Sequence, residues 1–301
     1  MANGYTGKIL RVNLTDGQIA VETPPESFYR RYLGGHGFVG YYLLNEVPRG
    51  ADPLGPDNLL IFAGGATTGV PVAGGGRSSV GGKSPLTGLY GEAEAGGFFG
   101  AEMRMAGFDA IVIRGRAQEP VYLWVHDGEA EIRPARHLWG LATLECRRAL
   151  QQELGDPRVR VAVIGPAGEM LSPLACIMHD VKHAAGRTGM GAVMGSKNLK
   201  AIAARGQSAI PIASPDDLKA LARWMRDNWR SKAERLHDSG TAGGVMELND
   251  FGALPTRNFQ DGRFAGAEKI SGQTMRDTIL IDRGGCYACP IRCKRVVSVD
   301  D

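Results

Sequence analysis

The stretch Cys286-Tyr287-Ala288-Cys289-Pro290-Ile291-Arg292-Cys293 holds three of the chain's five cysteines within eight residues, in the spacing C-x2-C-x3-C. Two glycines precede it and Pro290 lies inside it, which favours a wrapping loop over a regular helix. In such a loop, three closely spaced thiolates converge and bind a soft metal ion or an iron–sulfur cluster. Lys294 and Arg295 follow, and their positive charge would partly offset the negative charge of the thiolates.

The cysteine spacing favours a [4Fe–4S] cluster over other cysteine centres. Structural zinc sites use paired C-x2-C units or sets of four cysteines and histidines, and no histidine lies near this triad. Disulfide frameworks are typical of short secreted chains, and three free thiols in a surface loop would be prone to oxidation. We therefore predict that Cys286, Cys289 and Cys293 are three of the four ligands of a [4Fe–4S] cluster.

The other two cysteines are predicted to be small buried hydrophobic residues. Cys146 falls in an expected helix over 143–154, and Cys176 falls in an apolar run. Neither is an obvious fourth ligand of the cluster.

The composition is that of an ordinary globular protein. The 301 residues are 43% hydrophobic and 22% charged, which is enough for one large core or two domains. The formal net charge of +3 is too small to indicate binding to nucleic acid or to a membrane. The sequence has no signal peptide and no apolar run of about 18 residues, so a cytoplasmic protein is expected.

Two glycine-rich segments are predicted to bind an anion. In the first, residues 64–100, the stretch Gly74-Gly75-Gly76-Arg77 places backbone amides beside one guanidinium group, a combination suited to phosphate. The alternative for this segment is a set of glycine-rich turns in a sheet. In the second segment, residues 184–197, backbone amides and Arg187 would bind a phosphate before a helix that begins near Gly189.

Strands and helices are mixed without the regular rhythm of a parallel sheet, which predicts the α+β class. Turn residues indicate two hairpins, one over 8–13 and 18–22 and one over 121–126 and 129–133. The other expected elements are strands over 59–63, 110–114, 159–164 and 201–204, a short amphipathic segment over 26–33, and helices ending at 105 and spanning 143–154.

We place a domain boundary within residues 206–213. An α+β domain over 1–208 is predicted to precede the beginning of a mainly helical domain over 209–301, which carries the cysteine loop. Ser214-Pro215-Asp216-Asp217 begins a helix with a cap, a proline and acids in the first turn. An apolar face at helical spacing follows and is predicted to be core; its members are Leu218, Leu221, Ala222, Met225 and Trp229.

Taken together, these features resemble the aldehyde ferredoxin oxidoreductase family, which comprises tungsten enzymes and some molybdenum relatives. Beyond the two glycine-rich segments and the cysteine loop, the resemblance covers residues 4–14, 83–88 and 164–169. It implies a metal held by two pterin dithiolenes, whose phosphates bind the first domain, with a [4Fe–4S] cluster nearby.

The resemblance also implies roles for particular residues. Arg77 and Gly96 in the first segment would contact the tungstopterin, or molybdopterin, and Ala184, Gly186 and Arg187 in the second would do the same. Cys286, Cys289 and Cys293 would be cluster ligands. No catalytic acid or base is assigned.

Two positions depart from the family pattern, and the length differs. Glu94 stands where family members can carry asparagine, and a carboxylate there would repel phosphate unless it is protonated or bridged by a cation. His183 stands where a relative carries arginine. Family members are about twice as long, so a fragment or a split-gene product that is inactive alone is expected.

The function implied by the resemblance is the oxidation of aldehydes to carboxylic acids. The expected partners are a small aldehyde substrate, ferredoxin or another electron-transfer protein, and a missing C-terminal half or split subunit; a homodimer is left open. The alternative is a non-catalytic iron–sulfur subunit for electron transfer or assembly.

Overall fold

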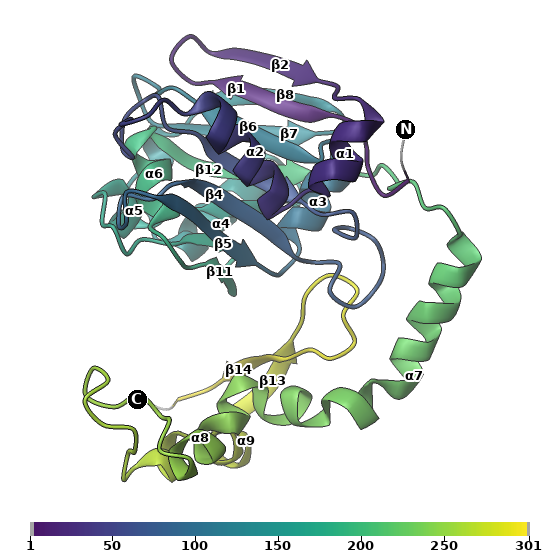
Figure 1. The fold of residues 1–301 in the computed structure, drawn as a ribbon, viewed down its shortest axis with the longest axis vertical. Helices are drawn as coiled ribbons and strands as arrows, with labels where there is room; N and C mark the ends of the chain where they lie inside the picture. The colour runs from purple at the N-terminus through teal and green to yellow at the C-terminus, as the bar shows by residue number, and fades with distance from the viewer. Residues whose placement is uncertain (1–2, 300–301) are drawn as a thin grey trace.

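The computed structural model describes residues 3–299 and consists of a β-rich part and a smaller helical part (Figure 1). The β-rich part holds two six-stranded mixed sheets, and a third, two-stranded sheet carries the cysteine loop. This mixture confirms the α+β class. No helix in the described part of the chain is both long and apolar enough to cross a membrane.

The first sheet has the order β2-β1-β6-β3-β4-β5. Its β1 and β6 pair in parallel and its other neighbours pair antiparallel. The strands are β1 (Ile9–Asn13), β2 (Gln18–Glu22), β3 (Leu60–Gly64), β4 (Ser78–Lys83), β5 (Tyr90–Ala95) and β6 (Ala110–Arg114). The predicted hairpin of β1 and β2 is therefore confirmed.

The second sheet has the order β11-β10-β9-β12-β7-β8, and only β12 and β7 pair in parallel. Its strands are β7 (Val121–His126), β8 (Glu129–Pro134), β9 (Arg160–Val163), β10 (Ile177–His179), β11 (His183–Ala185) and β12 (Leu199–Arg205). The predicted hairpin of β7 and β8 is also confirmed.

Alternating side chains give each sheet two apolar faces. In β3, Leu60 and Phe62 belong to the core between the sheets, whereas Ile61 and Ala63 face the helices α1 (Glu26–Tyr32) and α2 (His36–Glu46). The second sheet does likewise, because its outer face packs against α4 (Thr143–Glu153). The central core also includes side chains of α3 (Phe99–Met105) and α6 (Met190–Ser196).

Beyond β12 the chain becomes mainly helical, as predicted. The long helix α7 (Pro215–Ser239) leads from the β-rich part to the small helical part (Figure 1). The remaining short elements are α5 (Pro166–Glu169), α8 (Val245–Asp250), α9 (Gly272–Thr278) and the 3-10 turns η1 (Arg136–Leu138), η2 (Gly240–Gly244) and η3 (Ala267–Ile270). The domain division at residue 208 stays a prediction.

The apolar face of α7 is not core, so that prediction is wrong. Leu221 is 50% exposed, and only Ser239 is buried in the whole helix. The reason is that α7 bridges two parts of the molecule and most of its length packs on neither. Ser214 does precede the helix, but its hydroxyl donates to the Asp217 carboxylate instead of capping a backbone amide.

Sequence patterns missed β4, β5 and α2. The two strands lie in the first glycine-rich segment, part of which is therefore buried sheet. Gly81 in β4 explains the composition, because a Cβ there would lie 2.3 Å from Val39 Cγ1 of α2. Glycine lets the helix lie directly on the strand at the cost of β propensity.

Candidate functional site

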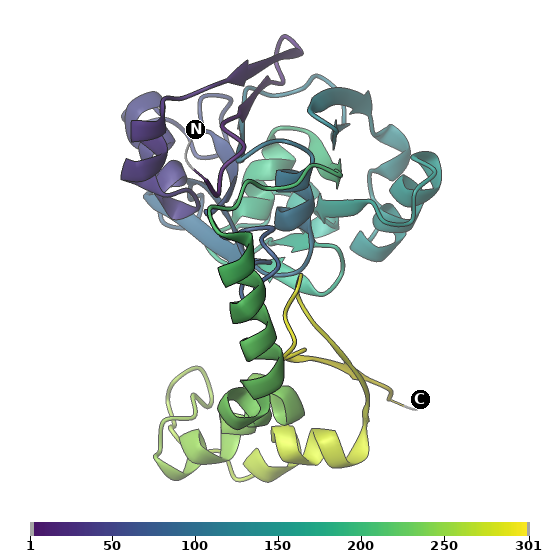
Figure 2. The ribbon, with the colours of Figure 1, turned by 90° about the vertical axis from the view of Figure 1, so that its right-hand side faces the viewer.

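The cysteine loop joins β13 (Leu280–Gly284) to β14 (Lys294–Val297) and reaches back to the β-rich part (Figure 2). Two residues within it, Ala288 and Arg292, have positive φ angles of 51° and 49°, which wrap the backbone tightly. The Tyr287 amide donates a hydrogen bond to the Gly97 carbonyl at 3.0 Å. The predicted wrapping loop is thus docked against the first glycine-rich segment.

Glycines at this junction make room for the loop. A Cβ at Gly76 would lie 3.0 Å from Cys286 Cβ, and a Cβ at Gly96 would lie 2.8 Å from Cys286 Sγ. A Cβ at Gly97 would lie 2.8 Å from the His183 ring. The sequence predicted that the backbone amides of this segment bind an anion. In the structure, the absence of a side chain at these glycines allows the cysteine loop to approach closely.

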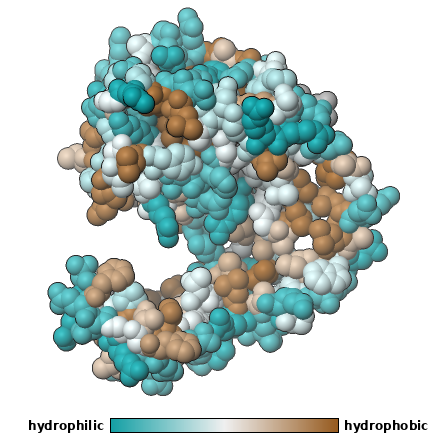
Figure 3. All heavy atoms as spheres, in the orientation of Figure 1, coloured by the Kyte–Doolittle hydropathy of each residue, from teal (hydrophilic) through white to brown (hydrophobic). Residues whose placement is uncertain are grey.

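A cavity of about 420 Å³ lies between the cysteine loop, the β-rich part and the start of the helical part. Figure 3 shows a hollow between the upper and lower parts of the molecule. Five of the eight predicted cofactor and cluster residues line the cavity: Arg77, Gly96, Ala184, Cys286 and Cys293. The helical part contributes Leu236, Ser239, Gly240, Thr241, Ala242 and Met275, none of which the sequence pattern had indicated.

The other three predicted site residues lie elsewhere. Cys289 lines a neighbouring cavity with Phe98, Pro290 and, again, Cys286. Gly186 and Arg187 follow β11 directly and are exposed, but they do not line the cavity that contains Arg77. The structure therefore does not bring the two predicted arginines onto one wall.

Positive groups dominate the cavity wall. Arg77, Lys294 and Arg295 line it, and Glu94 is the one carboxylate among its described lining residues. Arg77 Nη1 lies 3.6 Å from Glu94 Oε2, and both side chains are well exposed, so this contact neutralises neither group fully. The excess of positive charge suits an anionic ligand.

His183 connects the cavity to the cysteine loop. Its side chain is buried, and its Nδ1 lies 3.9 Å from Cys286 Sγ. Burial, together with the nearby charges of Lys294, Lys182 and Arg77, lowers the pKa of His183 to about 4. The imidazole is consequently neutral at pH 7, unlike the arginine that the family resemblance would place here.

The cysteines outside the loop differ from each other. Cys146 is fully buried, as predicted, and burial raises its pKa to about 11. Cys176 is only partly buried, so the prediction of a buried residue is wrong there; its Sγ lies 3.7 Å from Met178 Sδ. Neither of these thiols lines the cavity.

The three loop thiols are partly buried and free of disulfide bonds. Within residues 3–299, they do not form a group whose sulfur atoms all lie within 4.8 Å of one another. Thiolates around one zinc ion would lie about 3.8 Å apart, given a Zn–S distance of about 2.3 Å and tetrahedral geometry. As they lie, the three thiols therefore do not form a single-zinc site.

Comparisons with known proteins cover nearly the whole chain. Residues 9–206 match the family "Aldehyde ferredoxin oxidoreductase, N-terminal domain", and residues 219–301 match "Aldehyde ferredoxin oxidoreductase, domains 2 & 3". A tungsten-containing aldehyde ferredoxin oxidoreductase of Pyrococcus abyssi is 47% identical over 97% of this chain and 49% of its own length.

Two further relatives are named for other compounds. The WOR-like subunit of an aliphatic sulfonate oxidoreductase of Pyrococcus furiosus is 33% identical over 97% of this chain and 49% of its own length. The solved active-site complex BamBC of benzoyl coenzyme A reductase, with 1,5-dienoyl-CoA, matches with a TM-score of 0.86 and 32% identity, covering 100% of this chain and 48% of that one. The chain spans about half the length of these relatives.

Proposed function

Because the chain belongs to the aldehyde ferredoxin oxidoreductase family, we propose that it forms the cofactor-binding half of a tungsten- or molybdenum-pterin oxidoreductase. In this proposal the enzyme oxidises aldehydes to carboxylic acids and passes the electrons through a [4Fe–4S] cluster to ferredoxin. The observation that carries it is the shared cavity of about 420 Å³, in which cysteines and cationic side chains meet.

The residues around this cavity fit the two implied groups. Cys286, Cys289 and Cys293 offer soft thiolate ligands for the cluster, and the glycine at 96 leaves space beside Cys286 Sγ that a Cβ would fill. Arg77 and Lys294 are suited to bind the pterin phosphates. When bound, the pterin-held metal supplies two-electron redox chemistry and the cluster supplies single-electron transfer.

Within this proposal the chain's own residues bind the cofactor phosphates and position the cysteine loop. The cations hold the phosphates, the glycines at 76 and 96 let the cysteine loop approach the cofactor-binding wall, and neutral His183 occupies the space between wall and loop. We assign no catalytic acid or base to this chain. The non-catalytic alternative is not favoured, because the relatives are named as oxidoreductases or as the active-site complex of a reductase.

The proposal is tested on protein purified without oxygen from its source cells. We expect tungsten or molybdenum, pterin and about four irons per chain, together with reduction of ferredoxin that depends on added aldehyde. Protein with the metal and pterin but no aldehyde-dependent reduction would leave the cofactor assignment intact and refute the substrate. Protein without pterin would refute the whole proposal.

Variants test the anion-binding residues. Arg77→Ala should lower the pterin content, because a charge-assisted hydrogen bond contributes about 1.5–3 kcal/mol; Arg187→Ala and the double variant test whether the second segment adds to this. Arg136→Ala and Arg158→Ala are matched controls, since both arginines are exposed and pair with acids away from the cavity. Equal pterin content in the double variant and the controls would exclude phosphate binding by these arginines.

A further inference from the structure

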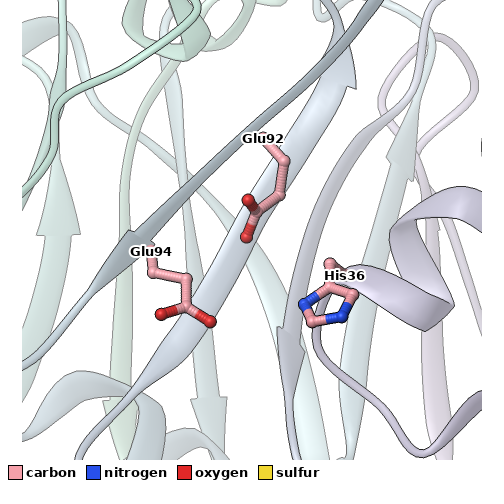
Figure 4. A group of neighbouring side chains, drawn as sticks. All are labelled: His36, Glu92 and Glu94. Carbon is pink, nitrogen blue, oxygen red and sulfur yellow. The ribbon is translucent and has the colours of Figure 1, made fainter.

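His36, Glu92 and Glu94 form a cluster beside the cavity that the proposed function does not use. Glu92 and Glu94 project from the same face of β5, two residues apart, and His36 is the first residue of α2, which packs over that edge of the sheet. Figure 4 shows the two carboxylates and the imidazole turned toward one another. One ligand atom from each residue lies within 4.8 Å of the other two.

The three groups face each other without bonding. Among residues 3–299, neither the His36 ring nor the Glu92 carboxylate has a hydrogen-bond or ion-pair partner, and Glu92 Oε1 is buried without one. The ring nitrogens of His36 are therefore too far from the carboxylates for direct bonds, yet close enough to share a ligand. A buried carboxylate oxygen is unfavourable without a hydrogen-bond or metal partner, so we expect a ligand to satisfy it.

Neither the start of α2 nor the nearest arginine satisfies Glu92. The first turn of α2 does not bind the carboxylates, because the amides of Gly37 and Phe38 donate to backbone carbonyls instead. Arg77 is near Glu94 only, and at 3.6 Å it makes a long, exposed contact. Among residues 3–299, Glu92 and His36 are thus left without a charged partner, and Glu94 has only the long contact with Arg77.

We propose that His36, Glu92 and Glu94 bind a divalent first-row transition-metal ion, with water completing its coordination. Metal–nitrogen and metal–oxygen bonds of about 2.0–2.2 Å place neighbouring ligand atoms about 3–3.6 Å apart. The three side chains, whose ligand atoms lie within 4.8 Å of one another, would therefore move slightly closer together around an ion. One imidazole with two carboxylates suits Mn²⁺, Fe²⁺ or Zn²⁺ better than Mg²⁺ or Ca²⁺, which prefer oxygen alone. The site does not depend on the proposed function.

The test uses Mn²⁺ as the probe, because Mn²⁺ prefers oxygen and nitrogen and leaves the soft thiols of the cysteine loop alone. The purified chain is stripped with EDTA and titrated with Mn²⁺, with binding followed by electron paramagnetic resonance. We expect one saturable Mn²⁺ per chain, with nitrogen coupling from one imidazole. Glu92→Gln should weaken binding at least about tenfold, and His36→Gln should abolish the nitrogen coupling.

Controls separate this site from acids and histidines elsewhere in the chain. Glu119→Gln and His137→Gln change an exposed acid and an exposed histidine, each paired in the fold, and should leave binding unchanged. Mn²⁺ should also raise the unfolding temperature of the wild type but not of Glu94→Gln, an exposed substitution that carries the test if His36→Gln or Glu92→Gln fails to fold. No saturable binding, or equal binding by the wild type and Glu94→Gln, overturns the proposal.

Discussion

Gly76→Ala should undock the cysteine loop from the β-rich part. The new Cβ would lie 2.6 Å from the Gly97 carbonyl oxygen, 3.0 Å from Cys286 Cβ and 3.1 Å from the Tyr287 amide nitrogen. Contacts between carbon atoms are favourable at about 3.5–4.0 Å, so the methyl group would overlap with all three of these atoms. None of these atoms is the end of a flexible side chain, so rotamer changes cannot relieve the overlap.

The expected size of the effect follows from two energies. Overpacking of this kind costs about 1–3 kcal/mol, whereas the hydrogen bond from Tyr287 to Gly97, the described backbone bond that docks the loop, contributes about 0.5–1.5 kcal/mol. Releasing the loop is therefore the cheaper way to relieve the overlap. Hydrogen exchange at the Tyr287 amide should accelerate by up to about 2- to 13-fold, which is the protection that this hydrogen bond provides, because each 1.36 kcal/mol corresponds to a factor of ten.

Exchange is measured by mass spectrometry on peptides that contain Tyr287. Gly40→Ala in α2 is the control, because a Cβ at Gly40 meets nothing within 4 Å and alanine favours a helix by about 0.5–1 kcal/mol. The control should leave exchange at Tyr287 unchanged. Unchanged exchange in Gly76→Ala as well would show that the close approach at Gly76 does not hold the loop, and the reasoning would fail.

Three further perturbations have defined outcomes. Asp109→Asn should lower the free energy of unfolding in denaturant by about 3–5 kcal/mol, because Asp109 and Arg104 form a fully buried ion pair at 3.0 Å; a loss below about 1 kcal/mol would contradict this. Burial lowers the pKa of His179 to about 3 in the folded chain, so only the unfolded state binds a proton there as the pH falls below about 6.5. The free energy of unfolding should therefore fall between pH about 6.5 and about 3. In thermal melts at a series of pH values, His179→Leu should flatten that slope. In cluster-loaded protein, His183→Ala should lower the midpoint potential in a redox titration, because it removes a polar group 3.9 Å from a cysteine sulfur; an unchanged potential would exclude that role.

Turn residues and short apolar runs made several strands predictable. The expected strands over 18–22, 110–114 and 121–126 coincide with β2, β6 and β7. The prediction of strands failed where tertiary packing decides the residue type against its intrinsic strand preference. In β4, glycine is needed at position 81 because α2 lies directly on the strand there, and no local pattern distinguishes such a strand from a loop.

The candidate site was predictable in its parts but not in its assembly. Cysteine spacing alone indicated a metal-binding loop, and glycine next to Arg77 indicated an anion-binding segment. That Gly76 and Gly96 contact Cys286 depends on two segments far apart in the sequence, which no local pattern connects. The prediction that the apolar face of α7 is core failed for a related reason. Helical spacing of apolar residues reveals a face of the helix but not whether another element covers it.

Docking of the cysteine loop links the two binding functions that we propose for the cavity. The hairpin of β13 and β14 carries Cys286 and Cys293 together with Lys294 and Arg295, and all four line the cavity. His183 is neutral and Glu94 is acidic where the family resemblance suggests arginine and asparagine, so these two cations supply most of the positive charge beside Arg77. Undocking the hairpin would therefore remove the proposed cysteine ligands and the proposed phosphate-binding charge in one movement. Gly76→Ala should consequently lower the pterin content as well as expose the loop.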